Sequence, residues 1–285
     1  MRVLVTGAGG QLGSDVVAVC EAAGDQVIAA DHAALDVGDR DAVLGAVTTI
    51  QPDAVVHAAA WTAVDACEAD PERAFRDNAM AARHVADGCR RAGAHLCFVS
   101  TDYVFDGTKD GPYVEWDDPR PLSVYGRSKL AGEREVAALA PGSTIVRTSW
   151  VCGLRGSNMV RTVLRLAAEP DRALAFVDDQ RGCPTFTADL AVAVRRLTVG
   201  RFAGTYHVTN AGPVSWFEFV GDVLEAAGHD RSRVRPITTA ELDPPRPAPR
   251  PANSVLDNAA LRAAGLPAMR HYREPLRELV EAMLG

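Results

Sequence analysis

Short apolar runs alternate with longer amphipathic stretches along the first half of the chain. The runs have the length and composition of buried strands, and they lie at residues 2–6, 26–30, 53–60, 95–99 and 144–149. Helical patterns continue from the first run to about Ala23 and extend over residues 68–91, and a further helix opens at Ser123. Strands and helices in alternation predict an α/β fold with a doubly wound parallel sheet of Rossmann type.

The second half of the chain is less regular. We expect a helix within residues 153–168, a strand at 174–177, and helices at 188–199 and 215–227. The helix at 188–199 is expected to return to the sheet, and Ser215 is a good cap because Glu218 follows it in the capping-box position. These patterns predict one unit of residues 1–150 plus roughly 183–200, and a smaller C-terminal α/β unit of residues 151–182 and 201–285.

A glycine-rich turn at residues 7–13, with the sequence GAGGQLG, joins the first strand to the first helix. Glycines let a backbone approach a pyrophosphate, and the free N–H groups of a helix N-terminus attract negative charge. The order of strand, turn and helix therefore predicts a dinucleotide-binding site in the first unit; the alternative is a tight turn that binds nothing. The G-x-x-G-x-x-G spacing is similar to that of the extended short-chain dehydrogenase/reductases.

Acidic and small residues follow the next strands where a nucleotide would lie. Asp31 ends the second strand, near the offset at which an acid binds the adenine ribose 2′-hydroxyl. An acid there repels a 2′-phosphate, so we expect NADH to be accepted, while the use of NADPH stays open. A strand-end turn aspartate is the alternative. Alanines 58–60 end the third strand and leave room for a cofactor close to the backbone.

Tyr125 and Lys129 are the first candidates for chemistry. They are four residues apart, which puts a phenol and an ammonium on one face of a helix. A nearby cation favours the phenolate of a tyrosine, whose free pKa of about 10 makes it inert at neutral pH. The chain has only two lysines, Lys109 and Lys129, and arginine cannot replace a compact ammonium. Thr101, at the end of the fourth strand, reaches the same sheet edge and completes a Thr/Tyr/Lys set.

The composition excludes several classes of protein. A net charge of −7 argues against a nucleic-acid partner, and no apolar run is long enough for a membrane span. Six scattered cysteines without a C-x-x-C pair favour neither a zinc site nor a disulfide framework. We therefore expect a cytoplasmic protein with reduced thiols, no signal peptide and no metal.

Residues 244–251 contain five prolines, with Arg246 and Arg250 between them. Such a segment cannot form a regular helix or a central strand, and it has little conformational freedom to lose. Rigid arginines are suited to grip a diphosphate with paired N–H bonds. A stiff connector with solvated arginines is the alternative.

Seven sequence motifs between residue 3 and about 257 resemble those of the dTDP-4-dehydrorhamnose reductase family. They are VTGAGGQLG, HAAAWTAVDACE, STDYVFDG, VYGRSKLAGE, VRTSWV, VDDQRGCPT and APRPANSVLD. The resemblance implies NADH- or NADPH-dependent reduction of the C4 ketone of dTDP-4-dehydro-L-rhamnose to dTDP-L-rhamnose. It also implies that the smaller unit binds the sugar nucleotide.

The resemblance assigns roles to individual residues. The catalytic set is Thr101, Tyr125 and Lys129. The cofactor would contact Gly7, Gly10, Gln11, Leu12, Gly13, Asp31, Asp36, Val37, Ala60, Trp61, Thr62, Tyr125 and Lys129. The substrate would contact Thr101, Asp102, Tyr125, Trp150 and Arg250, with the indole of Trp150 packed against the sugar ring. An asparagine at position 78 helps to shape the site in such reductases, although a solvent-facing side chain is an equal alternative.

Two residues depart from the family pattern. His57 stands where asparagine is frequent and Trp61 where histidine is frequent, and both are expected beside the nicotinamide, which leaves the coenzyme preference open. Some bacterial members dimerise around magnesium through acidic residues that have no match here. No metal is therefore expected, and a homodimer is one oligomeric state to test.

Three rival functions share much of this pattern. A 4-ketoreductase for another dTDP-4-keto-6-deoxy sugar would have the same residues. A non-catalytic subunit related to the partner of methionine adenosyltransferase would not need the Thr/Tyr/Lys set. An epimerase or dehydratase would hold NAD tightly and consume no NADH.

Overall fold

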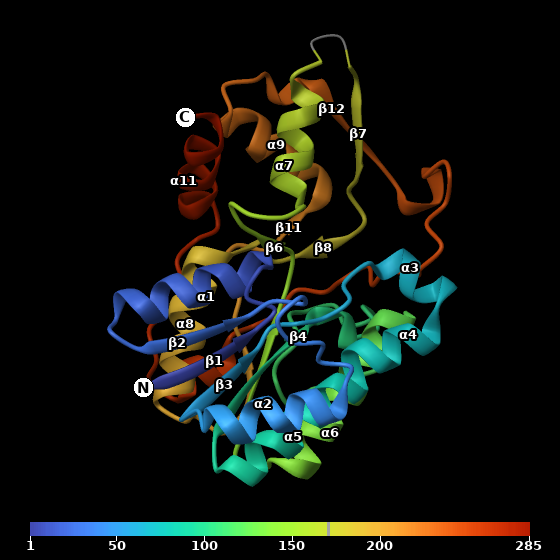
Figure 1. Ribbon diagram of the computed structural model, residues 1–285. Helices are drawn as coiled ribbons and strands as arrows, with labels where there is room; N and C mark the ends of the chain where they lie inside the picture. Colours follow the sequence, from blue (N-terminus) through green and yellow to red (C-terminus); the bar gives the residue numbers. More distant parts are fainter. Residues whose placement is uncertain (170–171) are drawn as a thin grey trace.

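The computed structural model describes residues 1–169 and 172–285, and its centre is a six-stranded parallel sheet (Figure 1). The order of the strands is β10-β5-β4-β3-β1-β2, and every neighbouring pair runs parallel. The strands are β1 (Arg2–Thr6), β2 (Gln26–Ala30), β3 (Ala54–His57), β4 (His95–Thr101), β5 (Thr144–Thr148) and β10 (Gly204–His207). The Rossmann-type sheet predicted from the sequence is confirmed.

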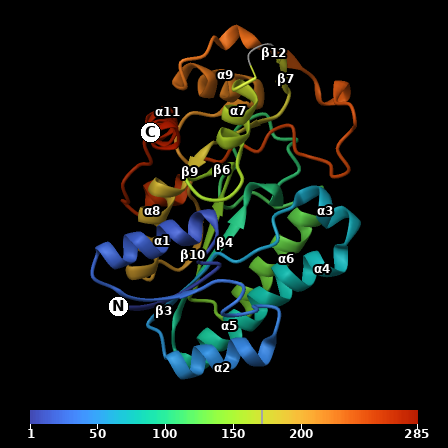
Figure 2. The ribbon, with the colours of Figure 1, turned by 45° about the horizontal axis from the view of Figure 1, so that its top comes forward.

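Helices cover both faces of this sheet, as the two ribbon views show (Figures 1 and 2). One face carries α1 (Gln11–Ala22) and α8 (Thr187–Val199), and the other carries α2 (Arg40–Ile50), α5 (Ala81–Ala92) and α6 (Val124–Leu139). Side chains alternate between the faces, so Val3 and Val5 of β1 join the first core while Leu4 joins the second. The helix predicted at 188–199 therefore returns to the sheet as expected.

The helix predicted over residues 68–91 is interrupted. It consists of α3 (Val64–Ala69), α4 (Pro71–Phe75), a π-helical turn (Arg76–Met80) and α5. Asp70 separates the first two, because its side chain caps Arg73 N at 3.0 Å and Pro71 starts the new helix without an N–H group. π-Helical turns within α-helices are frequent at functional sites.

In the residues that the structure describes, the second unit has three short strand pairs and three helices around its own apolar core. The pairs are β6 (Val151–Cys152) with β9 (Thr185–Phe186), β7 (Leu174–Val177) with β12 (Val234–Ile237), and β8 (Arg181–Gly182) with β11 (Val214–Ser215). The helices are α7 (Met159–Ala167), α9 (Trp216–Ala226) and α11 (Arg273–Leu284). Ser215 and Glu218 form the predicted capping box at the start of α9.

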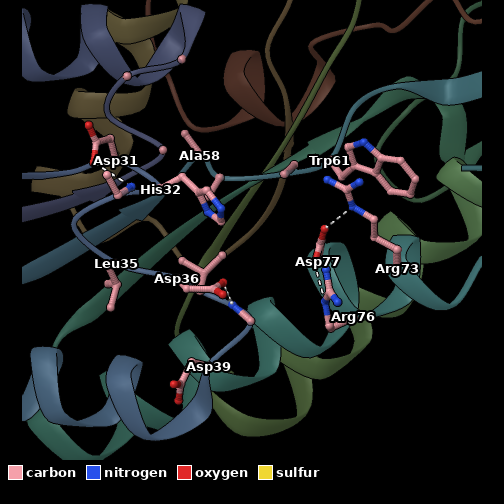
Figure 3. A pocket seen from close by; sticks show the side chains of 18 residues that line it. Asp31, His32, Leu35, Asp36, Asp39, Ala58, Trp61, Arg73, Arg76 and Asp77 are labelled. Carbon is pink, nitrogen blue, oxygen red and sulfur yellow. Dashed lines mark hydrogen bonds and ion pairs between the residues drawn. The ribbon is translucent and has the colours of Figure 1, made fainter. Parts of the chain in front are cut away.

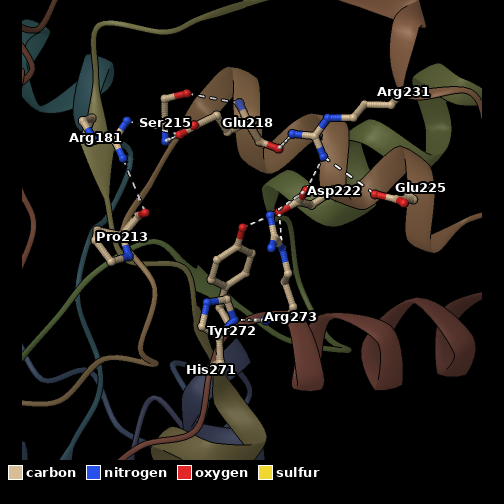
Figure 4. Close-up of polar contacts among 10 residues, drawn as sticks. All are labelled: Arg181, Pro213, Ser215, Glu218, Asp222, Glu225, Arg231, His271, Tyr272 and Arg273. Atoms are coloured by element: carbon tan, nitrogen blue, oxygen red, sulfur yellow. Dashed lines mark hydrogen bonds and ion pairs between the residues drawn. The ribbon is translucent and has the colours of Figure 1, made fainter.

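A buried carboxylate joins the last helix to this core (Figure 4). Asp222 of α9 accepts hydrogen bonds from Tyr272 and from two arginines, Arg231 and Arg273, the last at 2.9 Å. These contacts hold the start of α11 against α9, where Phe219 and Leu276 pack in the same core.

The remaining elements are short. They are the 3-10 turns η2 (Asp102–Val104), η3 (Arg231–Arg233) and η4 (Thr239–Glu241), and the helix α10 (Ala259–Ala263). The proline-rich residues 244–251 form no helix or strand, as predicted. No helix in the described ranges has both the length and the apolarity needed to cross a membrane.

One segment of the predicted second unit, which was residues 151–182 and 201–285, lies in the main sheet instead. Residues 204–207 form β10, which pairs with β5 at the edge of the main sheet. The sequence Gly-Thr-Tyr-His lacks the apolar run by which the other strands were predicted. β10 therefore belongs to the main sheet of the first unit, and the division into two domains stays a prediction.

Candidate active site

The carboxyl ends of β1, β2 and β3 border a cavity of about 890 Å³ (Figure 3). The glycine-rich turn forms one wall and packs tightly on the end of β3. A Cβ atom at Gly7, whose φ is +72°, would lie 2.6 Å from the Ala59 nitrogen, and one at Gly13 would lie 2.1 Å from the Gly7 oxygen. Only glycine fits both positions, and the turn exposes its backbone to the cavity. This cradle and its volume fit a dinucleotide.

Seven of the predicted cofactor residues line this cavity: Gly7, Gly10, Asp31, Asp36, Val37, Ala60 and Trp61. One carboxylate oxygen of Asp31 accepts hydrogen bonds from Ala33 N at 3.0 Å and Ala34 N at 2.9 Å, and its Cβ lies above Gly9. Asp36 similarly accepts from Gly38 N at 2.9 Å. Both aspartates are thus fixed by turns and face the cavity.

The other predicted cofactor residues, Gln11, Leu12, Gly13, Thr62, Tyr125 and Lys129, lie outside its lining. Leu12 is buried in the core under α1. The amide of Gln11 donates to the Ser157 carbonyl at 3.0 Å and accepts from Asn158 at 2.9 Å, so it connects α1 to the second unit. The cofactor roles of these six residues stay predictions.

A basic rim of the cavity was missed by the sequence reasoning. The Arg73 guanidinium lies 4.3 Å from the centre of the Trp61 ring, and both Arg73 and Arg76 pair with Asp77, at 3.2 and 2.8 Å (Figure 3). These side chains and His32 line the same cavity as Asp31. The only sequence signal was their position in the helix that follows Trp61.

Asn78 is buried in the π-helical turn, which excludes the solvent-facing alternative. Its side-chain oxygen accepts from Trp61 N at 2.8 Å, and its amide nitrogen donates to Trp61 O at 3.1 Å and to Ser128 Oγ at 2.9 Å. Asn78 therefore joins the loop after β3 to the helix that carries Tyr125 and Lys129.

Thr101 and Tyr125 are brought together at the next strand end. Thr101 is the last residue of β4, Tyr125 lies in the first turn of α6, and both are buried. Burial raises the pKa of Tyr125 above its ordinary value, and the neighbouring hydroxyl of Thr101 offsets part of this rise. The phenol is therefore protonated at neutral pH, which is the form that can donate a proton.

The ammonium of Lys129 has two contacts that the sequence did not indicate. Its ammonium donates to the Val99 carbonyl at 2.7 Å and lies 4.2 Å from the centre of the Phe98 ring. Burial lowers the pKa of Lys129 to about 7, while the charge of Glu133 opposes this shift. Burial raises the pKa of Tyr125, and the stabilisation of its phenolate by Lys129 stays a prediction.

His57 is the last residue of β3, and it does not line the cavity. Its ring is fully buried, stacks on Phe98 and shares a 2.7 Å hydrogen bond between Nδ1 and Thr6 Oγ1. Burial, followed by the charge of Lys129, lowers the pKa of His57 to about 3, so the imidazole is neutral. The expectation that His57 flanks the nicotinamide finds no support in this geometry, whereas Trp61 does line the cavity.

Asp102 lies directly behind Thr101. Its carboxylate accepts from the hydroxyl of Thr101 at 2.9 Å and from that of Ser149 at 2.8 Å. Burial raises the pKa of Asp102 to about 6, although hydrogen bonds from Ser254, Ser149 and Thr101 oppose the rise. A carboxyl that titrates near neutrality is thus in contact with the predicted catalytic threonine.

Trp150 stands where the chain leaves β5 for the second unit, with an unusual φ of +45°. Its ring stacks on Trp216 with centroids 3.5 Å apart and an angle of 6° between the planes. A Cβ at Gly182 would lie 2.5 Å from Trp150 Cε2, so that glycine makes room for the indole. No pattern in the sequence indicates the contact with Trp216.

Arg250 is not a free guanidinium. It donates to both carboxylate oxygens of Asp65, at 3.0 and 2.8 Å, and Arg246 lies 3.7 Å from the same carboxylate. The guanidinium of Arg250 also neighbours the partly buried phenol of Tyr103, whose ring meets that of Tyr125 edge to face at 5.8 Å. The arginine that was predicted to contact a diphosphate is thus already paired with a carboxylate.

The doubly wound sheet, the glycine cradle and the Tyr-x-x-x-Lys helix at its carboxyl edge define an extended short-chain dehydrogenase/reductase fold. The chain belongs to the family described as RmlD substrate binding domain, whose model matches residues 1–284. This finding confirms the resemblance to the dTDP-4-dehydrorhamnose reductases.

Known proteins resemble the chain over nearly its whole length. A Streptomyces griseus protein described as dTDP-4-dehydrorhamnose reductase is 43% identical over 290 residues, which cover 100% of this chain and 94% of that protein. A probable dTDP-4,6-dihydroxy-2-methyloxan-3-one 4-ketoreductase of Streptomyces antibioticus is 42% identical, with 98% and 94% covered. The structure of dTDP-4-dehydrorhamnose reductase from Bacillus anthracis in complex with NADP is 37% identical, with a TM-score of 0.92 over 99% and 98% of the two chains.

Proposed function

We propose that this protein reduces the C4 ketone of dTDP-4-dehydro-L-rhamnose to dTDP-L-rhamnose with NADH or NADPH. The observation that carries the proposal is the meeting of Thr101 and Tyr125 at the carboxyl edge of a sheet that also cradles a dinucleotide-sized cavity. The full-length similarity to the Streptomyces griseus reductase supports the choice of substrate.

The surroundings of Thr101, Tyr125 and Lys129 support a separate role in the reaction for each residue. A bound reduced nicotinamide supplies the hydride for the ketone carbon. Tyr125 donates a proton to the ketone oxygen, since burial keeps its phenol protonated, and the Thr101 hydroxyl holds that oxygen. One N–H group of Lys129 is used by the Val99 carbonyl, which leaves further donors for ribose hydroxyls.

The proposal includes both NADH and NADPH because of the charged side chains that line the cavity. Asp31 offers a carboxylate to a ribose hydroxyl, which favours NADH. Arg73 and Arg76 line the same cavity and bring positive charge, which favours the 2′-phosphate of NADPH. The NADP complex of the Bacillus anthracis relative is consistent with this second coenzyme.

The substrate is proposed to bind between the two units. Ser149, the residue before Trp150, donates to Asp102 at the sheet edge, and Arg250 neighbours Tyr103, whose ring meets that of Tyr125. Gly182 and Trp216 surround the Trp150 indole, so we expect the sugar to meet the part of that ring they leave uncovered.

The cellular setting belongs to the proposal as well. All six cysteines are buried and unpaired in the part of the chain that the structure describes, which supports a reducing, cytoplasmic compartment. A homodimer stays a prediction, and sedimentation of the purified protein tests it.

A second candidate is a 4-ketoreductase that acts on another dTDP-4-keto sugar. The similarity to the Streptomyces antibioticus protein favours it, because that relative is 42% identical over 98% of the chain. The stereochemistry at C4 of the product, read by NMR of the isolated sugar nucleotide, distinguishes the two reductases.

The experiment measures NADH and NADPH oxidation by the purified protein against a panel of dTDP-4-keto sugars. We expect turnover with dTDP-4-dehydro-L-rhamnose, and a loss of about a hundredfold or more in kcat for Tyr125→Phe and Lys129→Met. Both variants should still bind coenzyme in a fluorescence titration. Lys109→Met, which changes the other lysine, is the matched control and should keep full turnover.

Coenzyme oxidation also separates the remaining rivals. A regulatory subunit would consume no coenzyme with any sugar, and an epimerase or dehydratase would arrive with bound NAD and show no net consumption. Near-normal turnover of both Tyr125→Phe and Lys129→Met would refute the assignment of the catalytic set.

A further inference from the structure

Two indoles stack where the chain leaves β5 for the second unit. The rings of Trp150 and Trp216 are nearly parallel, with centroids 3.5 Å apart. Both side chains are partly exposed at the edge of the apolar core of the second unit, whereas Phe219, which neighbours both rings, is fully buried. The pair therefore closes the core and also leaves aromatic surface open to a ligand.

Trp150 has a backbone conformation that bulky residues rarely adopt. Its φ of +45° lies in the left-handed region, and such strain persists only where the surroundings enforce it, frequently at functional sites. The preceding residue, Ser149, donates to Asp102 at 2.8 Å, and Asp102 accepts from the hydroxyl of Thr101 at 2.9 Å. The strained residue thus directly follows the hydrogen-bonded group that contains the predicted catalytic threonine.

One strand pair brings two neighbours to the Trp150 indole. Gly182 of β8 pairs with Val214 of β11, and Trp216 follows as the first residue of α9. A Cβ at Gly182 would lie 2.5 Å from Cε2 and 2.6 Å from Nε1 of Trp150, so the indole rests against the backbone there. Because Gly182 and Trp216 come from the same strand pair, together they fix the position of the indole.

The start of α9 holds Trp216 in place (Figure 4). Ser215 N donates to Glu218 Oε2 at 2.8 Å, and Glu218 N donates to Ser215 Oγ at 3.1 Å. Arg181 donates to the same carboxylate oxygen at 3.2 Å, and the hydroxyl of Ser215 donates to Asp178 at 2.5 Å. These hydrogen bonds fix the backbone on which Trp216 is mounted before any ligand binds.

We propose that Trp216 is a positioning residue for the substrate, because its stack on Trp150 fixes the indole against which the keto sugar packs. The inference rests on the proposed function, in which Trp150 meets the sugar, and it extends that contact to a residue of α9. A side chain that is immobilised only on binding lowers affinity, whereas a preformed one does not. The fixed indole offers a rigid apolar surface to the C–H and methyl groups of a 6-deoxy sugar.

The test compares Trp216→Leu, which removes the stack, with Trp216→Phe, which keeps an aromatic face. We expect the leucine variant to raise KM for the sugar nucleotide about tenfold and to change kcat by less than about twofold. The phenylalanine variant should restore most of the affinity, and coenzyme affinity should stay the same in both. Trp116→Leu, at a side chain that is 70% exposed, is the matched control and should change none of these quantities.

Gly182→Ala tests the same contact without a change at Trp216. The added methyl group would collide with the Trp150 indole and must displace it. We therefore expect the same rise of KM with little change of kcat. If Trp216→Leu does not fold, this variant decides the question.

A third measurement does not depend on turnover. Fluorine NMR of the protein labelled with 5-fluorotryptophan gives one signal for each of the four tryptophans, and single substitutions assign them. The Trp150 signal should shift when dTDP-L-rhamnose is added to the unaltered protein. In Trp216→Leu the shift at the same concentration of sugar nucleotide should be much smaller.

Several outcomes would overturn the proposal. They are an unchanged KM in Trp216→Leu or, where that variant does not fold, in Gly182→Ala, a Trp216→Phe variant as impaired as Trp216→Leu, and a Trp150 signal that does not respond to dTDP-L-rhamnose. Equal losses of kcat and coenzyme affinity would overturn it too, since they indicate general damage to the fold. If the unaltered protein reduces no keto sugar but its Trp150 signal responds to dTDP-L-rhamnose, the proposed reduction fails and the positioning role of Trp216 stands.

Discussion

At the scale of single residues, Lys129 illustrates how function opposes stability. Its ammonium is buried against Phe98 and the Val99 carbonyl, and this burial lowers its pKa to about 7. A lysine in the unfolded chain titrates near pH 10.4. Folding therefore desolvates a charge at neutral pH, and the native state is held at a cost that is present at pH 7 and below.

This burial predicts that Lys129→Met stabilises the protein while it removes turnover. Between about pH 7 and 10 the unfolded chain binds more protons than the native state, so the stability of the unaltered protein rises with pH in this window. The variant should be more stable by on the order of 3 kcal/mol at pH 7, and its advantage should shrink toward pH 10.

Urea unfolding of both proteins at several pH values measures this difference. Lys109→Met is the control, because Lys109 is partly exposed and pairs with Asp117 at 2.5 Å, so its substitution should leave the pH slope unchanged. A stability difference between Lys129→Met and the unaltered protein that stays constant from pH 7 to 10 would show that Lys129 does not titrate in this window.

The positions of residues could be predicted from the sequence where a side chain follows directly from a strand end or a helix turn. Thr101 and Tyr125 were placed together because strand ends of a parallel sheet share one edge, and the structure has them in contact. Lys129 was expected to face Tyr125, but a four-residue spacing does not reveal that the Val99 carbonyl competes for the ammonium. The partner of Trp150, Trp216, is 66 positions away in the chain, and no local pattern indicates it.

At the scale of elements, Glu133 connects the three that carry the candidate site. It lies one turn after Lys129 on α6, accepts from Ser100 of β4 at 2.5 Å, and pairs with Arg147 of β5 through bonds of 3.0 and 2.7 Å. Ser100 precedes Thr101, and Arg147 lies two residues before Ser149. One buried ion pair thus fixes the register between the helix and both strands.

This arrangement predicts a large loss of stability for Arg147→Met. The substitution leaves the Glu133 carboxylate buried without a cation, which should lower the free energy of unfolding by about 3 to 5 kcal/mol. The double variant Glu133→Gln with Arg147→Met should lose less than the single one, because no unpaired charge remains. Urea unfolding at neutral pH measures both.

The surface pair between Arg83 of α5 and Glu135 of α6 provides the control, since Glu135 lies on the same helix as Glu133. Their side chains are 47% and 32% exposed, so Arg83→Met should change the free energy of unfolding by less than about 1 kcal/mol. If Arg147→Met were no more harmful than Arg83→Met, the buried pair would contribute nothing that a solvated pair does not.

Helices and strands could be predicted where the hydrophobic periodicity and the capping residues agree. The five strands with apolar runs and the capped helix α9 follow the sequence closely, because burial on both faces of the sheet demands such runs. Prediction failed at β10, an edge strand with polar residues, and in the region 68–91, where Pro71 and the π-helical turn break one apolar pattern into several helices. A turn with one extra residue has no signature in hydrophobic period alone.

At the scale of the whole molecule, a strap of residues 246–254 runs from the second unit across the first. Ala248 and Arg250 bind Asp65 of α3, Pro251 packs on Gly107, and the Asn253 amide donates to the Lys109 carbonyl at 2.7 Å. In Figure 1 this orange segment descends beside α3. The sequence predicted its stiffness from the prolines, but the contact of Arg250 with Asp65, 185 positions away, depends on the folded chain.

The strap predicts the effect of Asp65→Asn on substrate binding. The carboxylate of Asp65 holds the Arg250 guanidinium by two hydrogen bonds and the Ala248 N–H by a third, at 3.1 Å. Without its charge the strap should loosen, so that KM for the sugar nucleotide rises about tenfold, the equivalent of 1.4 kcal/mol, while coenzyme affinity stays the same. Steady-state kinetics and coenzyme titration measure the two quantities.

Hydrogen exchange tests the physical cause. The Ala248 amide should exchange faster in Asp65→Asn, since its acceptor is weakened, whereas amides of the main sheet should keep their protection. Asp87→Asn, which disturbs a surface cluster with Arg90 and Arg91 on α5, is the control and should change neither KM nor exchange at Ala248. Faster exchange with an unchanged KM would mean that the strap is anchored by Asp65 but that its anchoring does not position Arg250 for the substrate.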